Sequence, residues 1–309
     1  MEITNPHDKF FKENFSDKDI ATDFINGTFP QKLVENLDLS TLELDNASYI
    51  DEKLKEYYSD LVYDCYYKAT KVKISILFEH KSYVPDYPFL QLLKYIINIW
   101  EYNIKQNQNL MPIIPIIFYH GVEKWEYKKF YDYFDGIDKE LKQFLPDFDY
   151  LLTDLSNYAD IEIKERIFKN EMLKVLILIM KNIFDEEKLQ KNLEKFLIIG
   201  KLYYEEEKGL KFLESIIRYL YTNLENVKVD DIVEIIKGIS ERGGGDSMTI
   251  AMKLKQEGRD EGKIEGKIED AINMFKDGLP MDKIIKYTGV NRNKLDEILT
   301  NIQKDNKND

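Results

Sequence analysis

Residues 57–82 read YYSDLVYDCYYKATKVKISILFEHKS and contain two strand-like runs joined by a short connection. The first run, 61–67, is rich in Val and Tyr, which favour β-strands. In the second run, 72–79, every second residue is large and apolar: Ile74, Ile76 and Phe78. Alternation of this kind is typical of a strand with one buried face. The two runs therefore predict an antiparallel hairpin.

Three ionisable residues fall at one end of this predicted hairpin. Asp60 begins the first strand, and Glu79 and Lys81 end the second. Side chains two positions apart on a strand share a face, so we expect Glu79 and Lys81 to point the same way and His80 to point the other way. Antiparallel pairing then brings Asp60 to the same place, which predicts a triad of Asp60, Glu79 and Lys81.

The triad has the chemistry needed to hydrolyse a phosphodiester. Two carboxylates can hold a hard divalent cation, Mg²⁺ with Mn²⁺ or Ca²⁺ as alternatives, and leave room for waters and a phosphate. A lysine ammonium beside the attacking water can lower the pKa of that water or stabilise charge in the transition state. A Glu-x-Lys pair also occurs by chance in charged proteins, usually on a solvated strand face, so this assignment depends on its context.

The composition describes a globular protein with room for one sizeable domain and a smaller one. Of the 309 residues, 43% are hydrophobic and 33% are charged. The net charge of −13 argues against nucleic-acid binding by general basicity, so any DNA contact is expected to be local. Cys65 is the only cysteine, which excludes an internal disulfide and fits a cytoplasmic location. No signal peptide is recognised, and the longest apolar runs are too short to span a membrane.

Periodicity predicts the elements around the hairpin. We expect a helix over 5–15 that buries Phe10, Phe11 and Phe15 and is capped by Asn5 or Asp8. A second helix over 17–29 and a loop containing 37–44 precede the hairpin. After it, we expect a helix over 89–102, a central strand over 111–119 that is buried on both faces, and a short strand at 150–152. Further helices are predicted over 163–184, 186–199, 209–224 and 230–240.

The C-terminal part carries a separate pattern. Gly243 to Gly245 predict a hinge, followed by a polar helix over 248–275. Gly258, Gly262 and Gly266 recur every four residues in that helix, at a cost of about 1 kcal/mol each. Close approach of a partner helix explains such a stripe, and a frayed, solvated helix is the alternative. Residues 280–287 and 291–299 predict a small helix-turn-helix unit with few basic residues, which favours a packing module over a DNA-recognition helix.

Several segments of the chain together resemble one family. These segments are PHDKFFKENFSD (6–17), DLVYD (60–64), ISILFEHKS (74–82), QLLKYIINIW (91–100), PIIPIIFYHG (112–121), EGRDEGKIEGK (257–267) and LPMDKIIKYTGV (279–290). In this order they resemble the recombination-promoting nuclease (Rpn) or putative transposase family, which has a PD-(D/E)XK core. The resemblance covers nearly the whole chain and is firmest over 5–125.

The resemblance implies an α/β fold with a mixed central sheet flanked by helices, then a helical region and a C-terminal module. The implied division is a nuclease core at 1–160, a helical subdomain at 161–242, a glycine linker at 243–248, an oligomerisation module at 249–302 and a disordered tail at 303–309. The implied activity is metal-dependent endonuclease cleavage of double-stranded DNA that promotes recombination or genome exchange, and some members are thought to act in phage defence. The C-terminal segment is expected to assemble a homo-oligomer.

Residue roles carried over from the family place Asp60 and Glu79 as metal ligands and Lys81 as the catalytic base. The resemblance also implies that many relatives have Gln at the position of Lys81 and Arg at the position of Gln91. Lys81 matches the more general nuclease form, whereas the role of Gln91 stays open. Together with Tyr95, Gln91 resembles a Gln-x-x-x-Tyr motif beside the active site of other nucleases of the superfamily.

For several other residues, and for the function of the protein, the sequence leaves alternative interpretations open. Glu13 is a candidate helix-borne acid, and Asp64 either adds to the metal site or is a solvated acid. His7 either reaches the active site or takes part in capping or core hydrogen bonds, and His120 is expected to fix a turn. Zinc binding is not expected, because no Cys and His residues have ligand spacing. The competing functions are a noncatalytic interaction protein on a degenerate nuclease fold and a transposase, although the latter usually needs a larger basic surface.

Overall fold

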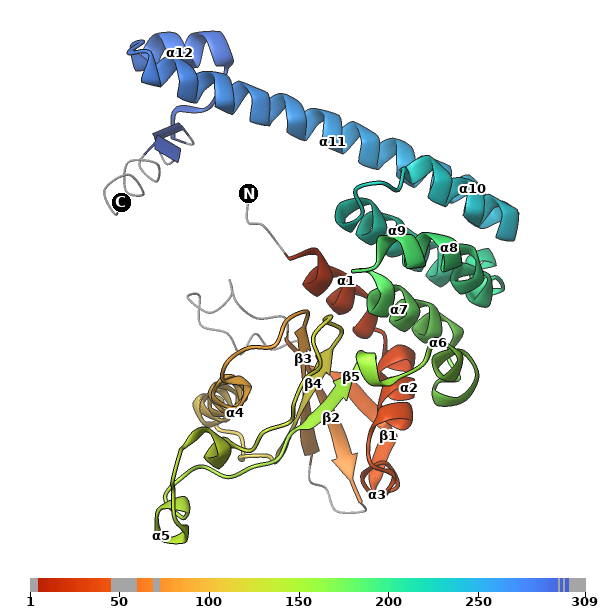
Figure 1. Ribbon diagram of the computed structural model, residues 1–309, viewed down its shortest axis with the longest axis vertical. Coiled ribbons are helices and arrows are strands. Elements are labelled where there is room, and N and C mark those ends of the chain that lie inside the picture. Colours follow the sequence, from red (N-terminus) through yellow and green to blue (C-terminus); the bar gives the residue numbers. More distant parts are fainter. Residues whose placement is uncertain (1–4, 46–59, 69–72, 294, 297, 300–309) are drawn as a thin grey trace. The chain divides into compact units, whose positions relative to one another are not determined.

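The computed structural model describes residues 5–45, 60–68, 73–293, 295–296 and 298–299, with the side chains of Asp60, residues 73–81 and Glu261 outside that description. Contacts divide the chain into two compact units, Met1–Ser247 and Met248–Asp309. The first unit is a mixed α/β structure with one sheet among many helices (Figure 1). Among the described residues, none of the helices has the length and apolar character needed to cross a membrane.

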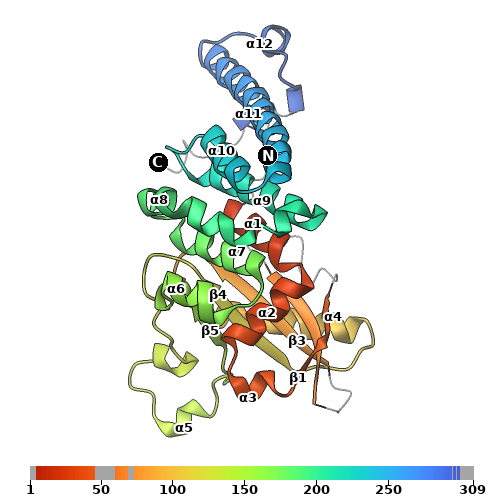
Figure 2. The same cartoon turned by 90° about the vertical axis from the view of Figure 1, so that its right-hand side faces the viewer.

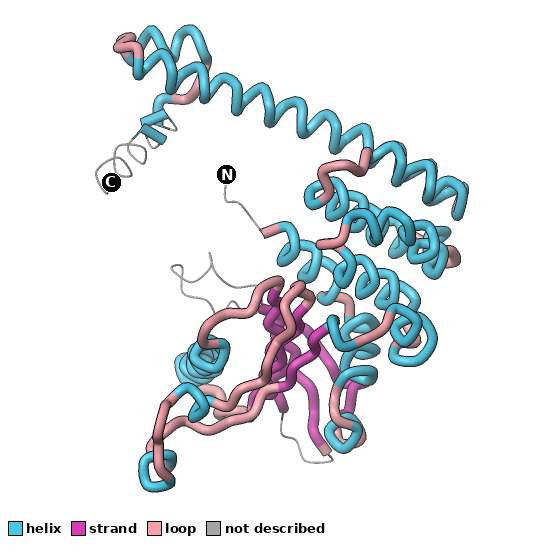
Figure 3. The backbone as a smooth tube through the Cα atoms, in the orientation of Figure 1, coloured by secondary structure: helices cyan, strands magenta, loops and turns pink. Residues whose placement is uncertain are grey.

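The sheet has five strands in the order β1-β2-β3-β4-β5, shown as one magenta layer in Figure 3. The strands are β1 (Leu37–Leu44), β2 (Asp60–Tyr67), β3 (Lys73–Lys81), β4 (Ile113–Tyr119) and β5 (Leu151–Asp154). The pairs β1–β2 and β2–β3 are antiparallel, whereas β3–β4 and β4–β5 are parallel. The predicted hairpin of β2 and β3 is therefore confirmed.

Two expectations for the strands need correction. Residues 37–44, predicted as a loop, form the edge strand β1. Its register against β2 shifts between Asp38 and Glu43, and this irregularity explains why the sequence lacks a clean two-residue alternation. The strand β4 is buried over its last residues as predicted, but β3 holds the centre of the sheet.

Helices pack on both faces of the sheet. The helices α1 (Pro6–Phe15), α2 (Lys18–Thr28) and α3 (Gln31–Val34) precede β1, and α4 (Pro88–Lys105) connects β3 to β4. Figures 1 and 2 show α2 on one face and α4 on the other. The predicted cap of α1 is Asn5, whose side-chain oxygen accepts a hydrogen bond from the His7 backbone N–H at 3.0 Å.

The two faces have different cores. On the α1–α2 face, the Phe118 ring contacts the rings of Phe11, Phe15 and Phe24, and all four side chains are fully buried. On the α4 face, one buried cluster contains Val62, Leu92, Tyr95, Ile99, Ile117, Tyr119, Trp125 and Tyr150. Adjacent residues of β4, Ile117 and Phe118, thus belong to opposite faces, as strand geometry requires.

The predicted helical region belongs to the same compact unit as the sheet. Its longer helices are α7 (Glu171–Asn182), α8 (Glu186–Leu197), α9 (Glu207–Asn223) and α10 (Val229–Ile239), and short turns of helix include α5 (Lys139–Lys142), α6 (Asp160–Glu162) and a π-helix (Ile163–Ile167). The helix predicted over 163–184 is broken at residues 168–170. There the Asp23 carboxylate accepts hydrogen bonds from the backbone N–H groups of Lys169 and Asn170, both at 2.8 Å, so these groups cannot enter a continuous helix.

The prediction of a hinge at Gly243 to Gly245, within the linker expected at 243–248, is wrong in conformation. Helix α11 (Glu241–Lys276) runs through Gly243 to Gly245 without interruption. A Cβ atom on Gly244 would lie 2.6 Å from the Cα of Lys237, so glycine here permits close approach of the end of α10. The boundary between the two units, after Ser247, nevertheless falls within the predicted segment.

The C-terminal unit has its own small core. It contains most of α11 and the helix α12 (Met281–Thr288), which ends at Gly289 in the left-handed conformation with φ of +68°. Its buried residues are Ala271, Ile284, Val290, Leu295 and Leu299. The sequence pattern predicts Ile284, Ile285, Val290, Leu295 and Ile298 as the core of the helix-turn-helix unit. Ile284, Val290 and Leu295 are buried as predicted, whereas Ile285 and Ile298 are only partly buried.

Candidate active site

Backbone register brings the predicted site residues to one end of β2 and β3. Asp60 is the Cα partner of Glu79 across the antiparallel pair. Along the parallel pair, Glu79 is the partner of Ile117 and Lys81 is the partner of Tyr119. The positions of Asp60, Glu79 and Lys81 are therefore neighbours on the sheet, although 18 residues of chain separate the first two in sequence.

Register also assigns these positions to a face. Paired residues of a sheet lie on the same face, and Ile117 and Tyr119 belong to the cluster beneath α4. Positions 79 and 81 are thus on the α4 face, and so is position 60. Position 80 pairs with Phe118, which packs among the aromatic rings of α1 and α2 on the opposite face.

The first prediction concerns His80. Because position 80 is on the face opposite to positions 79 and 81, His80→Ala is expected to lower the free energy of unfolding by about 1–3 kcal/mol while changing a cleavage rate by less than about tenfold. Urea unfolding and plasmid nicking measured on the same preparation compare the two effects. A variant that keeps full stability and loses all cleavage would contradict this division of the strand.

Helix α4 carries two further predicted residues over the same face. Gln91 lies in the first turn of the helix and is half-buried. Tyr95, one turn later, is 5% exposed and belongs to the buried cluster. Only residues 82–87 separate Lys81 from the start of α4, so the chain keeps the first turn of the helix near the end of β3. This arrangement places Gln91 on the helix that covers the candidate site.

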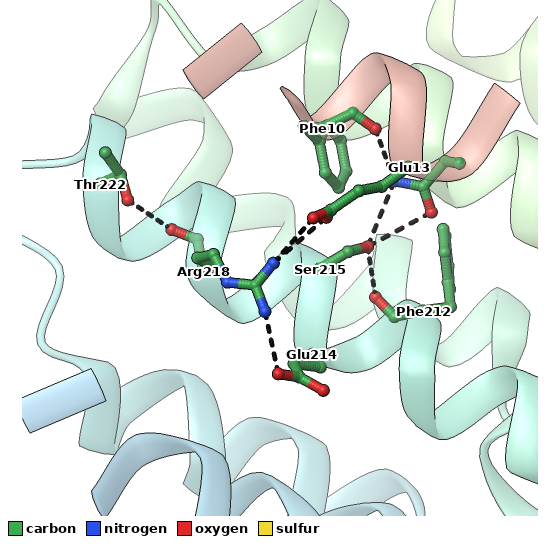
Figure 4. A network of polar contacts seen from close by, with 8 residues as sticks. Phe10, Glu13, Phe212, Glu214, Ser215, Arg218 and Thr222 are labelled. Carbon is green, nitrogen blue, oxygen red and sulfur yellow. Dashed lines mark hydrogen bonds and ion pairs between the residues drawn. The ribbon is translucent and has the colours of Figure 1, made fainter. Parts of the chain in front are cut away.

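Glu13 is engaged elsewhere. Its two carboxylate oxygens accept hydrogen bonds from Nη1 of Arg218 on α9, at 3.0 and 3.2 Å, and Arg218 also binds Glu214 at 2.8 Å (Figure 4). Next to it, the Asn14 side chain bonds to Ser215 at 3.2 Å. Helix α1 packs on the face opposite to positions 60, 79 and 81. The structure therefore gives Glu13 the role of joining α1 to α9.

The two histidines outside the hairpin meet on that same face. His7 Nδ1 lies 2.7 Å from the Tyr219 hydroxyl, and the rings of His7 and His120 are 5.1 Å apart. His120 is 1% exposed, with Nδ1 3.1 Å from the Met180 carbonyl oxygen. These contacts confirm core hydrogen bonding for His7, and they anchor the chain directly after β4 through His120.

Asp64 shares the strand with Asp60 but not its end. It lies four positions further along β2, about 13 Å away, opposite Ser75 and Glu43. Among the residues whose side chains the structure describes, no three or more His, Cys, Asp or Glu residues are grouped so that they could hold a metal ion. Asp60 and Glu79 are outside that set, so their role as ligands stays a prediction.

Comparison with known proteins identifies the family. Residues 5–211 match the family described as "Putative transposase, YhgA-like". The chain belongs to this family. The matched range covers the sheet, α4 and much of the helical region, and hence every residue of the candidate site.

Three proteins of Escherichia coli K12 are similar to this chain. The recombination-promoting nuclease RpnA is 26% identical over 94% of this chain and 96% of its own length. The recombination-promoting nuclease RpnC is 24% identical over 82% of each chain. A protein named as the inactive recombination-promoting nuclease-like protein RpnE is 26% identical over 82% of this chain and 83% of its own length. These names support a nuclease-related function, and since RpnE is named inactive, similarity alone does not establish activity. No solved structure matches the chain.

The structure places two further residues beside the candidate site that the sequence patterns did not single out. Tyr119 and Asp154 are Cα partners at the ends of β4 and β5, in one row with Lys81. Asp154 is 2% exposed, and its carboxylate accepts hydrogen bonds from the backbone N–H groups of Trp125 and Ser156, at 3.3 and 2.9 Å. Each of the two residues ends an apolar run, which is the only signal that the sequence offers. Only the pairing of the strands shows that the ends of β3, β4 and β5 form a row.

Proposed function

We propose that the protein is a divalent-metal-dependent DNA endonuclease with a PD-(D/E)XK core that promotes DNA recombination. The observation that carries the proposal is the register of β2 and β3, in which Asp60 is directly opposite Glu79 and Lys81 follows two residues later. The names of the relatives RpnA and RpnC supply the nuclease class and the link to recombination.

The order of elements supports the nuclease core. Three helices, α1 to α3, precede three antiparallel strands, and a further helix, α4, then leads to a strand parallel to the third. This order agrees with the mixed sheet flanked by helices that the family resemblance implies. In this arrangement, the last residues of the third strand lie beside the first residue of the second strand, at one end of the sheet. One hairpin therefore supplies all three residues of the triad.

The donor set fits a hard divalent cation. Asp60 and Glu79 would supply carboxylate oxygens, the ligands that Mg²⁺ prefers, and Mn²⁺ and Ca²⁺ share this preference. The bound ion supplies charge neutralisation at the phosphate and a more acidic bound water. Lys81 is assigned to the attacking water as base or as a cation facing the developing negative charge. Hydrolysis forms one bond from the water oxygen to phosphorus and breaks the bond to the leaving oxygen, which receives a proton.

A plasmid assay tests the proposal. Purified protein is incubated with supercoiled plasmid and Mg²⁺, Mn²⁺, Ca²⁺ or EDTA, and the nicked and linear products are separated. We expect cleavage with Mg²⁺ or Mn²⁺ and none with EDTA. Absence of cleavage with every metal, from folded protein that binds the metal, would instead favour a noncatalytic interaction protein. The observation that favours this second function is that the relative RpnE is named as an inactive nuclease-like protein.

We also propose that the C-terminal unit assembles a homo-oligomer. A Cβ atom added to Gly262 or Gly266 would meet nothing within 4 Å, so no contact among the described residues requires glycine at these two positions. Glycine costs helix stability, and close approach of a second helix is a reason to retain it. Two active sites held together would also offset the weak duplex binding expected of one acidic chain and allow both strands to be cut.

The second prediction tests this assembly. Substituting Gly258, Gly262 and Gly266 by Leu raises helix propensity but blocks close packing, so the variant is expected to become a smaller species by light scattering and to nick plasmid without linearising it. The matched control replaces the same glycines by Ala, which raises propensity with little added bulk. If the Leu variant keeps its oligomer size and its ratio of linear to nicked product, the helix is solvated and the stripe is no interface.

A further inference from the structure

The end of β4 holds a buried hydroxyl beside the candidate site. Tyr119 is the last residue of β4, is completely buried, and is the Cα partner of Lys81 on one side and Asp154 on the other. Its ring packs edge-on against Trp125, with ring centroids 5.1 Å apart. Within the described part of the chain, no group is in good hydrogen-bond geometry with its hydroxyl, although the Glu123 backbone amide is near enough to lower the pKa of Tyr119 slightly. A buried polar group of this kind calls for an explanation.

Gly121 shows what lies next to this hydroxyl. A Cβ atom built on Gly121 would overlap both the Tyr119 hydroxyl and the Ser82 carbonyl oxygen. Since both atoms border the same point, the hydroxyl lies beside the main chain of Ser82, the residue that follows Lys81. The absence of a side chain at Gly121 is what allows the two strand ends to approach this closely.

Burial, with a contribution from nearby charge, raises the pKa of this hydroxyl. Burial raises the pKa of Tyr119, and the carboxylates of Asp154 and Glu123 raise this pKa further, against a smaller opposing effect of the Glu123 backbone amide. Asp154 is itself held by two backbone N–H groups, as described above. At neutral pH, Tyr119 is therefore a hydrogen-bond donor, and the nearby carbonyl of Ser82 is a suitable acceptor.

We propose that Tyr119 is a positioning residue of the active site: when metal and DNA bind, its hydroxyl donates a hydrogen bond to the Ser82 carbonyl and fixes the end of β3 that carries Lys81. The inference rests on the proposed nuclease function. Hydrogen bonds that support catalysis are often long in the free enzyme and tighten in the complex, which fits a donor and an acceptor that are adjacent but not yet bonded.

The test compares Tyr119→Phe with Tyr63→Phe. The Tyr63 hydroxyl is also buried but already donates to the Phe15 carbonyl, on the side of the sheet where α1 packs. Tyr119→Phe is expected to keep the wild-type unfolding midpoint and to lower kcat for plasmid nicking at least tenfold, with KM for DNA and the metal dependence unchanged. Tyr63→Phe is expected to lower the unfolding midpoint and leave kcat within about twofold. Wild-type kcat in a folded Tyr119→Phe protein would overturn the proposal.

A readout that needs no cleavage separates this inference from the proposed function. Hydrogen–deuterium exchange of residues 82–87 is measured with Ca²⁺ and plasmid, and Tyr119→Phe is expected to exchange faster there than the wild type, with no change elsewhere in the sheet. If the wild type fails to cleave, the nuclease function fails, yet faster exchange in the variant still supports the role of Tyr119. Equal exchange in both proteins would overturn that role whatever the activity.

Discussion

Asp60→Ala protein is expected to lose nicking of supercoiled plasmid by at least about 10³-fold, since removal of a metal ligand costs several kcal/mol of transition-state stabilisation. The register that pairs Asp60 with Glu79 gives the same expectation for Glu79→Ala. Lys81→Ala is expected to lower the rate while leaving metal affinity largely intact, because an ammonium is not a metal ligand. Nicking assays and calorimetric titration of Mn²⁺ measure rate and affinity separately.

Asp64→Ala is the matched control for the loss of Asp60. It removes a carboxylate from the same strand, about 13 Å from the candidate site. The Asp64 variant is expected to keep its metal affinity and to cleave at a rate within about threefold of the wild type. Full cleavage by the Asp60→Ala protein would show that other residues hold the metal, and the assignment of Asp60 as a metal ligand would then be wrong.

A large loss of stability is expected when a single methyl group is added to α9 by the substitution Gly209→Ala. A Cβ atom on the buried Gly209 would overlap the carbonyl group of Tyr203 and lie 2.9 Å from the backbone nitrogen of Tyr204. Both obstacles are main chain, so relief requires the turn before α9 to move. Gly209→Ala is therefore expected to lower the free energy of unfolding by about 3 kcal/mol, as measured by urea denaturation.

Gly238→Ala provides the opposite expectation within the same compact unit. Gly238 lies on an exposed position of α10, where an added Cβ would meet nothing within 4 Å. The substitution is expected to stabilise by about 0.5–1 kcal/mol, because alanine loses less conformational entropy in a helix. If both substitutions change the free energy of unfolding equally, the turn at Tyr203 moves to accommodate the added methyl group without a cost in stability.

Local patterns predicted much of the first unit because its elements follow simple periods. The alternation over 72–79, the apolar run that ends at Tyr119 and the capped aromatic helix at Asn5 all appear in the structure with small shifts of their ends. The pattern failed at β1, where an irregular register hides the alternation, and at residues 168–170, where Asp23 captures two backbone amides from a distant part of the chain. No local window contains that partner.

The sequence by itself determined the hairpin, the identity of the candidate triad and the faces to which Glu79 and His80 belong, because strand alternation is a property of neighbouring residues. Only the tertiary structure decided that Arg218 engages Glu13, that His7 meets His120 and Tyr219, and that Gly243 to Gly245 continue a helix. It also decided that Lys81, Tyr119 and Asp154 form one row. The physical reason is that these contacts join segments far apart in the chain, and their register is set by packing of whole strands and helices, which no local period encodes.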